Sequence, residues 1–253
     1  MPRTIVAGNW KMHKTAAETR AFLDAFLAEA PSFPPSVTVV IAPPFTALAA
    51  AHDMLQKTDR VALGAQNVHW ELQGAYTGDI SVPMLLERGV TYVIVGHSER
   101  RAYFNELDRT VNLKVKTLLA RGITPIVAVG ETLEERDAGQ TDARVVSQTR
   151  EALDGLSDAD VCRVVMAYEP IWAIGTGHNC DAAEADRVMG AIRACIPALR
   201  DVPILYGGSM KADNVAGYMQ QPNINGGLVG GASLDPVTFA TLVRNTNPST
   251  SSG

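Results

Sequence analysis

The chain has 253 residues, of which 46% are hydrophobic and 19% charged, so it suits one large α/β domain or two small ones. Its formal net charge of -5 argues against a general nucleic-acid binder, because such proteins usually carry a basic face. The three cysteines form no CxxC pair and no apolar run approaches the length of a membrane span, so we expect a soluble, cytoplasmic protein without a disulfide framework.

Eight short apolar runs, rich in β-branched residues, divide the chain. They are continuous rather than alternating, which is typical of parallel strands buried on both faces. The segments between them carry helix signals, such as the capping spacings of Thr132 with Glu135 and of Asp181 with Glu184. The runs cover residues 4–8, 37–42, 61–65, 92–96, 125–130, 163–169, 203–208 and 226–231.

This alternation of strands and helices has two main solutions, an open doubly wound sheet and a closed (β/α)8 barrel. Eight units in a chain of this length favour the barrel. We therefore predict an α/β fold in which residues 1–247 form a single barrel domain and 248–253 form a flexible tail. The stretch 66–80 is longer than a usual loop between a strand and a helix, so it is expected to protrude.

Polar residues and glycine pairs follow the ends of these runs. In a barrel of this kind, the loops that leave the carboxyl ends of the strands meet at one rim and form the active site. The sequence therefore predicts one site, built from distant segments. Its candidate members are Asn9, Lys11, Gln66, His97, Glu99 and Glu169, with the glycine turns at 207–209 and 230–231.

The two glycine turns, GGS at 207–209 and GGAS at 230–233, indicate an anion site. One such pair alone is more often a tight turn, but two pairs after consecutive strands are typical of a phosphate held by backbone N–H groups. Lys11 would supply positive charge to such a site, although a single lysine is more often an ordinary surface residue. No nucleotide fingerprint and no metal-ligand spacing occur in the sequence.

The stretch YEPIWAIGTG at 168–177 places a carboxylate, Glu169, before Pro170 and an apolar loop. Burial under such a loop would raise the pKa of Glu169, which describes a general base beneath a lid. His97 either polarises a carbonyl or is a structural rim histidine. Glu99 is expected to join an ion-pair network with the arginines at 100–101.

Seven motifs then carry a resemblance to a known family. The sequence resembles the triosephosphate isomerases from end to end. This resemblance implies a TIM barrel and a cofactor-free proton transfer of glycolysis, which interconverts dihydroxyacetone phosphate and D-glyceraldehyde 3-phosphate through an enediol(ate). The motifs are NWKM (9–12), GAQNV (64–68), GAYTGDIS (74–81), VGHSERR (95–101), AYEPIWAIGTG (167–177), YGGS (206–209) and LVGGASL (228–234).

The resemblance also implies a role for each matching residue. Glu169 would be the base, and His97 a neutral imidazole whose pKa is held down by a helix N-terminus. Lys11 would offset negative charge on the substrate, and Asn9 would lie beside the enediolate oxygens. Tyr206, in YGGS, would support the site.

The same resemblance implies how the substrate is enclosed. A lid at 170–180 would close over the site, with Ile174 and Leu228 as an apolar clamp over the base. Backbone N–H groups would hold the phosphate; they belong to Gly175, Ser209, Gly230 and Gly231.

A homodimer is implied as well, formed through the 66–80 loop, with Thr77 reaching the partner's active site and Gln66 supporting the base of the loop. Two features depart from the usual family pattern. Ala128 stands where many members have cysteine, and the distal end of the lid reads His178, Asn179, Cys180.

Two other functions fit parts of the pattern. A glycoside hydrolase on the same fold would use Glu99 and Glu169 as a carboxylate pair, but the low aromatic content and Lys11 speak against a sugar-polymer cleft. A phosphate-binding barrel without catalysis would need the glycine turns alone. The joint presence of Glu169, His97 and Lys11 favours the enzyme.

Overall fold

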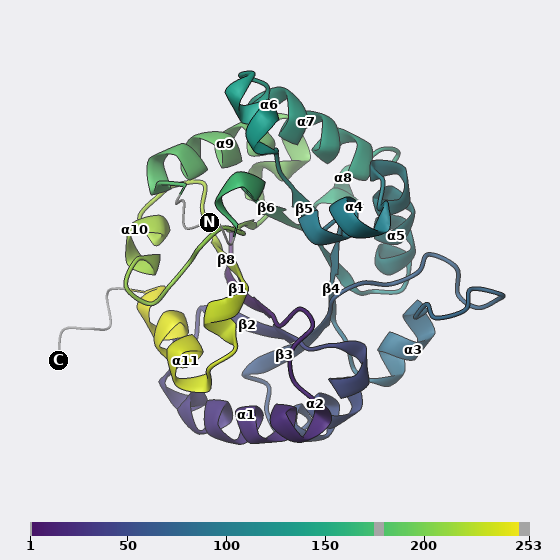
Figure 1. Cartoon of the computed structure of the whole chain (residues 1–253), viewed down its shortest axis with the longest axis vertical. Coiled ribbons are helices and arrows are strands. Elements are labelled where there is room, and N and C mark those ends of the chain that lie inside the picture. The colour runs from purple at the N-terminus through teal and green to yellow at the C-terminus, as the bar shows by residue number, and fades with distance from the viewer. Residues whose placement is uncertain (1, 175–179, 248–253) are drawn as a thin grey trace.

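Eight parallel strands close into a barrel in chain order, and a ring of helices surrounds them (Figure 1). The structure is a computed structural model that describes residues 2–174 and 180–247. Because β8 pairs with β1 as well as with β7, the sheet closes on itself, and the predicted (β/α)8 TIM barrel is confirmed. The strands are β1 Thr4–Asn9, β2 Val37–Ala42, β3 Val61–Ala65, β4 Tyr92–Val95, β5 Thr124–Val129, β6 Val165–Tyr168, β7 Ile204–Tyr206 and β8 Gly226–Val229.

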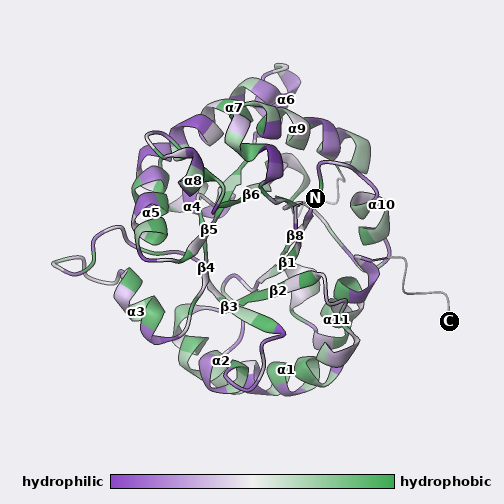
Figure 2. Ribbon diagram, turned by 180° about the vertical axis from the view of Figure 1, so that it is seen from behind, coloured by the Kyte–Doolittle hydropathy of each residue, from purple (hydrophilic) through white to green (hydrophobic). Residues whose placement is uncertain are grey.

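The helices carry both hydrophobic and hydrophilic residues, as an outer layer between core and solvent requires (Figure 2). Thr132 and Asp181 begin helices and accept hydrogen bonds from the N–H groups of Glu135 and Glu184, as predicted. The α-helices are α1 Ala16–Glu29, α2 Leu48–Leu55, α3 Val82–Glu87, α4 Ser98–Phe104, α5 Asp108–Ala120, α6 Leu133–Asp137, α7 Thr141–Ala152, α8 Asp158–Val161, α9 Ala182–Ala194, α10 Val215–Met219 and α11 Pro236–Asn245, and the 3-10 helices are η1 Ala30–Ser32, η2 Phe45–Ala47, η3 Ile171–Ala173, η4 Pro197–Asp201 and η5 Gly231–Ser233.

Apolar side chains form two layers, one inside the barrel and one between the strands and the helices. Along β1, Ile5 and Ala7 pack in the interior while Val6 packs in the outer layer, so both faces of the strand are buried. This explains why the runs read as continuously apolar. Ala128 of β5 lies in the interior layer and is fully buried.

The segment between β3 and α3 extends away from the barrel, as predicted for residues 66–80 (Figure 1). At its base, the Gln66 amide donates hydrogen bonds to the carbonyls of Lys11 (2.8 Å) and Ala42 (2.9 Å). Further out, the His69 ring lies against those of Trp70 and Tyr76, with centroids 4.1 Å apart in both pairs. The loop therefore has an internal structure of its own. No helix within residues 2–174 and 180–247 has the length and apolarity needed to cross a membrane.

Arg193 ties together the chain segments that lead into β7 and β8. From α9, its guanidinium donates to the carbonyls of Leu199 (3.1 Å) and Val202 (2.8 Å) and to the side chain of Asn225 (2.8 Å). Asn225 in turn accepts from the N–H of Ile204, the first residue of β7 (3.1 Å). Leu199, Val202 and Asn225 are all buried, so Arg193 supplies a charged donor to acceptors inside the fold.

We predict that Arg193→Met lowers the free energy of unfolding by about 3 kcal/mol, because several buried acceptors lose a charged donor. Urea unfolding at fixed protein concentration measures the change. Arg187→Met is the matched control, since the half-exposed Arg187 makes surface ion pairs with Asp142 and Glu184 that are worth about 1 kcal/mol or less. Equal losses in the two variants would contradict this role of Arg193.

Candidate active site

A cavity of about 300 Å³ opens at the carboxyl ends of the strands and gathers most of the predicted site residues. Residues from five strand ends or the loops that follow them meet there, as the barrel geometry requires. Glu99, Gln66, Thr77 and Tyr206 do not line it. The lining residues are Asn9, Lys11, His97, Glu169, Ile174, Gly207, Gly208, Ser209, Met210, Lys211, Leu228, Gly230, Gly231 and Ala232.

Glu169 follows β6 directly, and its carboxylate is almost fully buried, with 2% of the residue exposed. One oxygen lies 3.0 Å from His97 Nε2. The other accepts a hydrogen bond from the Ser98 N–H (2.9 Å), and the Ser98 hydroxyl donates to the first (3.3 Å). The carboxylate is therefore turned toward the start of α4. Gly207 permits this, because a Cβ there would lie 2.8 Å from Glu169 Cγ.

His97 is the N-cap of α4, and its Nδ1 accepts a hydrogen bond from the Glu99 N–H (3.2 Å). A ring nitrogen that accepts from an N–H carries no proton in that bond, so the single proton of a neutral ring belongs on Nε2. From there it donates to Glu169. The N-terminus of a helix thus selects the tautomer of this histidine.

The pKa directions in this arrangement differ from those expected. Burial acts to raise the pKa of Glu169, but His97, the Ser98 N–H and Lys11 together outweigh it, so the pKa of this carboxyl lies below its ordinary value. Burial acts to lower the pKa of His97, but the carboxylates of Glu169 and Glu99 outweigh it and raise that pKa. The expected raised pKa of Glu169 and depressed pKa of His97 are therefore wrong here, because each group lies beside the other.

Lys11 lies between the β1 end and α4, with its Nζ 2.6 Å from a carboxylate oxygen of Glu99. Glu99 thus forms an ion pair, but with Lys11 rather than with the neighbouring arginines. Arg100 pairs with Glu106 (2.6 Å), and Arg101 pairs with Asp108 (2.5 Å). The carboxylate of Glu99 instead fixes the one lysine that points into the cavity from β1.

Asn9, the last residue of β1, is 5% exposed, and its side-chain oxygen accepts from the Lys11 N–H (3.1 Å). This bond holds the turn in which Lys11 adopts a φ of 51°, a left-handed conformation that costs a residue other than glycine of the order of 1 kcal/mol. The turn directs both side chains to the cavity.

The glycine turns face the same cavity. Gly230 follows β8 directly as the N-cap of η5, and Ser209 follows the end of β7. Within the described ranges, the backbone N–H groups of Ser209 and Gly230 make no hydrogen bond. They are therefore available to bind an anion, and the predicted phosphate site stays a prediction. Gly175, the fourth predicted donor, lies outside the described residues.

The segment after Glu169 is anchored to the neighbouring strands. Trp172 Nε1 (2.8 Å) and the Tyr168 hydroxyl (3.0 Å) both donate to the buried carboxylate of Glu131, at the exit of β5. The Tyr206 hydroxyl donates to the Cys180 carbonyl (3.3 Å), so this residue contacts the far end of the predicted lid rather than the cavity. His178 and Asn179 lie outside the described residues.

Sequence reasoning missed Ser98, which makes two hydrogen bonds to Glu169. A signal was available, because Ser98 is the first residue of α4 after the N-cap His97, and the N–H groups of a first helical turn lack intrahelical partners. Thr77, by contrast, is exposed in the 66–80 loop. In the part of the chain that the structure describes, no group of three or more His, Cys, Asp or Glu side chains is arranged to hold a metal ion.

Comparisons with known proteins identify one family across nearly the whole chain. A family model described as triosephosphate isomerase matches residues 4–246. The triosephosphate isomerase of Nostoc punctiforme is 51% identical over 244 residues, which cover 96% of this chain and 98% of that protein. The triosephosphate isomerase of Trichodesmium erythraeum is also 51% identical, over 96% of this chain and 99% of its own.

We predict that Glu169→Gln moves the pKa of His97 from above to below its ordinary value, because the carboxylate that opposes the effect of burial is then gone. Nuclear magnetic resonance of the ring nitrogens across pH measures it. Glu99→Gln is the control and should lower this pKa less, since that carboxylate lies 3.7 Å from the ring. An unchanged His97 titration in Glu169→Gln would contradict the coupling.

Proposed function

Because the chain belongs to the triosephosphate isomerase family, it interconverts dihydroxyacetone phosphate and D-glyceraldehyde 3-phosphate, and we propose that Glu169 is the base of this reaction. The interconversion is a proton transfer through an enediol(ate) and a step of glycolysis. The observation that carries the proposal is a carboxylate that is 2% exposed, lines the cavity and lies 3.0 Å from His97.

A buried base must be strong at the moment when it takes the carbon-bound proton. In the arrangement described, three neighbours lower the pKa of Glu169: His97, the Ser98 N–H and Lys11. When the carboxylate turns from the start of α4 toward the substrate, it leaves the Ser98 N–H and His97 while it stays buried. Burial then dominates, the pKa rises, and Glu169 becomes the stronger base that the reaction needs.

His97 is the group that polarises the substrate carbonyl in this proposal. Its Nε2 proton, which now donates to Glu169, would donate to a substrate oxygen after Glu169 has turned away, while the Glu99 N–H keeps Nδ1 an acceptor. Lys11 would offset the charge that develops on the enediolate, and the Asn9 amide would lie beside its oxygens. Both side chains line the same cavity.

The phosphate is assigned to the part of the cavity that the loops after β7 and β8 line. The unpaired N–H groups of Ser209 and Gly230, together with those of Gly231 and Gly175, would hold its oxygens. Ile174 and Leu228 would cover the base and exclude water, which protects a charged intermediate. This division separates phosphate binding from proton transfer.

We also propose a cytoplasmic homodimer, in which the 66–80 loop docks on a second copy and Thr77 reaches that copy's active site. Support comes from large apolar side chains that are exposed near this loop. Met12 is 94% exposed, Tyr76 44%, Met84 53% and Phe104 64%, and Phe104 lines a pocket together with residues 67–70 of the loop. Exposed apolar side chains of this kind are typical of a surface that another chain covers. All three cysteines are free, which fits a reducing compartment.

We predict that Glu169→Asp lowers kcat about 100-fold or more, since the shorter side chain withdraws the carboxylate by about one methylene. Inhibition by inorganic phosphate should stay close to that of the unaltered enzyme. A coupled assay from glyceraldehyde 3-phosphate measures both quantities. Glu184→Asp, which shortens an acid paired with Arg187 on α9, is the control. Turnover near normal in Glu169→Asp would remove Glu169 as the base.

We predict that the protein sediments as a dimer at nanomolar concentration and that activity is lost on dilution below the dissociation constant, because part of each site comes from the partner. Analytical ultracentrifugation and an activity titration over the same concentrations test this together. A monomer with full activity at nanomolar concentration would rule out the obligate dimer.

A further inference from the structure

The main chain at the exit of β5 supports the segment that carries Glu169. The Glu169 N–H donates to the carbonyl of Val129 (2.8 Å), and the Ile171 N–H donates to the carbonyl of Glu131 (3.2 Å). The Glu131 carboxylate also holds Tyr168 and Trp172. Residues 129–131 therefore set the position of residues 168–172, on both sides of the proposed base.

Gly130, in the middle of this support, is in direct contact with the Glu169 main chain. A Cβ on Gly130 would lie 1.8 Å from the Glu169 carbonyl oxygen, closer than any side chain allows. The two main chains thus touch with no space between them. Because packed interiors transmit displacement, a movement of Gly130 moves Glu169 as well.

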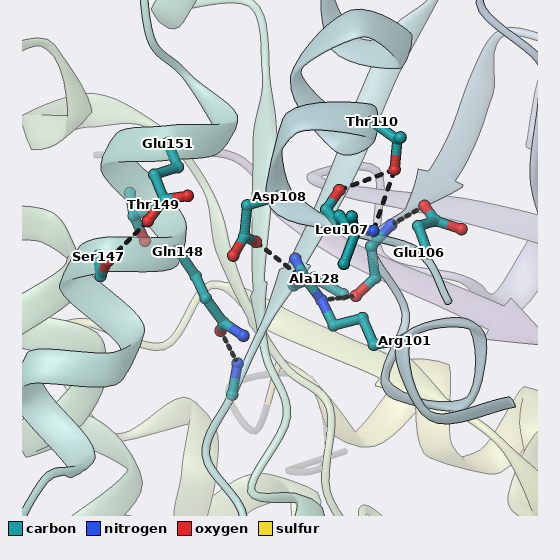
Figure 3. A network of polar contacts seen from close by, with 12 residues as sticks. Arg101, Glu106, Leu107, Asp108, Thr110, Ala128, Ser147, Gln148, Thr149 and Glu151 are labelled. Atoms are coloured by element: carbon teal, nitrogen blue, oxygen red, sulfur yellow. Dashed lines mark hydrogen bonds and ion pairs between the residues drawn. The ribbon is translucent and has the colours of Figure 1, made fainter. Parts of the chain in front are cut away.

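Gly130 is held from outside the barrel by Gln148 of α7. The Gln148 side-chain oxygen accepts a hydrogen bond from the Gly130 N–H (2.8 Å), and Gln148 is only 6% exposed. Figure 3 shows Gln148 pointing from α7 toward the strand ends, with this bond dashed. Within the described residues, no other group accepts from the Gly130 N–H.

We propose that Gln148 is a positioning residue for catalysis, which fixes the Glu169 main chain through Gly130. The inference rests on the proposed role of Glu169 as the base. Gln148 does not line the cavity and is separated from the reacting atoms by one main-chain segment. It acts on turnover because an error of about 1 Å in a base's position can cost about 100-fold in rate.

The test is a comparison of Gln148→Met with the unaltered enzyme. Methionine keeps the length of the side chain and removes the acceptor. We expect kcat for glyceraldehyde 3-phosphate to fall by about 10-fold or more, while KM and inhibition by inorganic phosphate change less than about 2-fold. Three of the four proposed phosphate donors, Ser209, Gly230 and Gly231, follow β7 and β8. The hydrogen bond of the Gln148 side chain goes instead to the exit of β5.

A matched control separates position from stability. Asn112 of α5 is also a buried amide that bonds main chain, but it donates to the carbonyls of Ala152 and Asp154, away from the cavity. Asn112→Leu should lower the melting temperature as much as Gln148→Met and leave kcat within about 2-fold. Gln148→Glu, which keeps an oxygen acceptor, should recover most of kcat.

If Gln148→Met does not fold, Gln148→Asn serves in its place, since this shorter amide cannot reach the Gly130 N–H. A kcat within about 2-fold of normal in either folded variant would overturn the proposal, and so would an equal loss of kcat in Asn112→Leu at the same melting temperature. Glu169→Asp, measured alongside, distinguishes the two proposals. Normal turnover in Glu169→Asp would contradict the assignment of Glu169 as the base. A large loss of turnover in Glu169→Asp together with normal turnover in Gln148→Met would contradict only the positioning role of Gln148.

Discussion

The position of the proposed base depends on one main-chain hydrogen bond, from the N–H of Glu169 to the carbonyl of Val129 (2.8 Å). It continues the parallel ladder between β5 and β6 by one residue beyond their paired ends. Up to that bond, the backbone is fixed by a closed sheet; beyond it, the chain is a loop. A carboxylate at this boundary is held as rigidly as a strand residue and still faces the cavity, a combination that catalysis needs.

At the same boundary the charge of the Glu169 carboxylate is buried, and neighbouring polar groups stabilise it. A buried carboxylate without partners would be costly, so the site supplies a ring N–H from His97 and the N–H and hydroxyl of Ser98. These groups come from the start of α4, where a helix offers unpaired N–H groups without further structure. Both partners lie at the start of α4, and Glu169 also lines the cavity. In the proposed mechanism, a turn of this one side chain therefore exchanges a stabilised anion for a stronger base.

The sequence predicted the strands and the gathering of residues at one rim, because continuous apolar runs and residues at their ends are local features. Side-chain partners were harder to predict. The arginines beside Glu99 suggested an ion pair with that residue, yet Glu99 pairs with Lys11, 88 residues away. The pKa directions of Glu169 and His97 were wrong for the same reason, because the distance between the two side chains decides them and no sequence pattern encodes that distance.

The rim that carries the candidate site is held from the helix layer as well as by the barrel. Arg101 donates to the carbonyls of Gly96 (2.6 Å) and Ala128 (3.2 Å), and Glu106 accepts from the Gly96 N–H (2.9 Å), directly before His97 (Figure 3). The ladder between β4 and β5 ends at Val95 and Val127, directly before Gly96 and Ala128. Their main-chain groups therefore need other partners on this side, and polar side chains on α4 and the turn to α5 supply them. Such side chains touch no substrate. They nevertheless set the main chain from which the side chain of His97, a proposed catalytic residue, extends. On that proposal, residues of the outer layer take part in the geometry of the reaction.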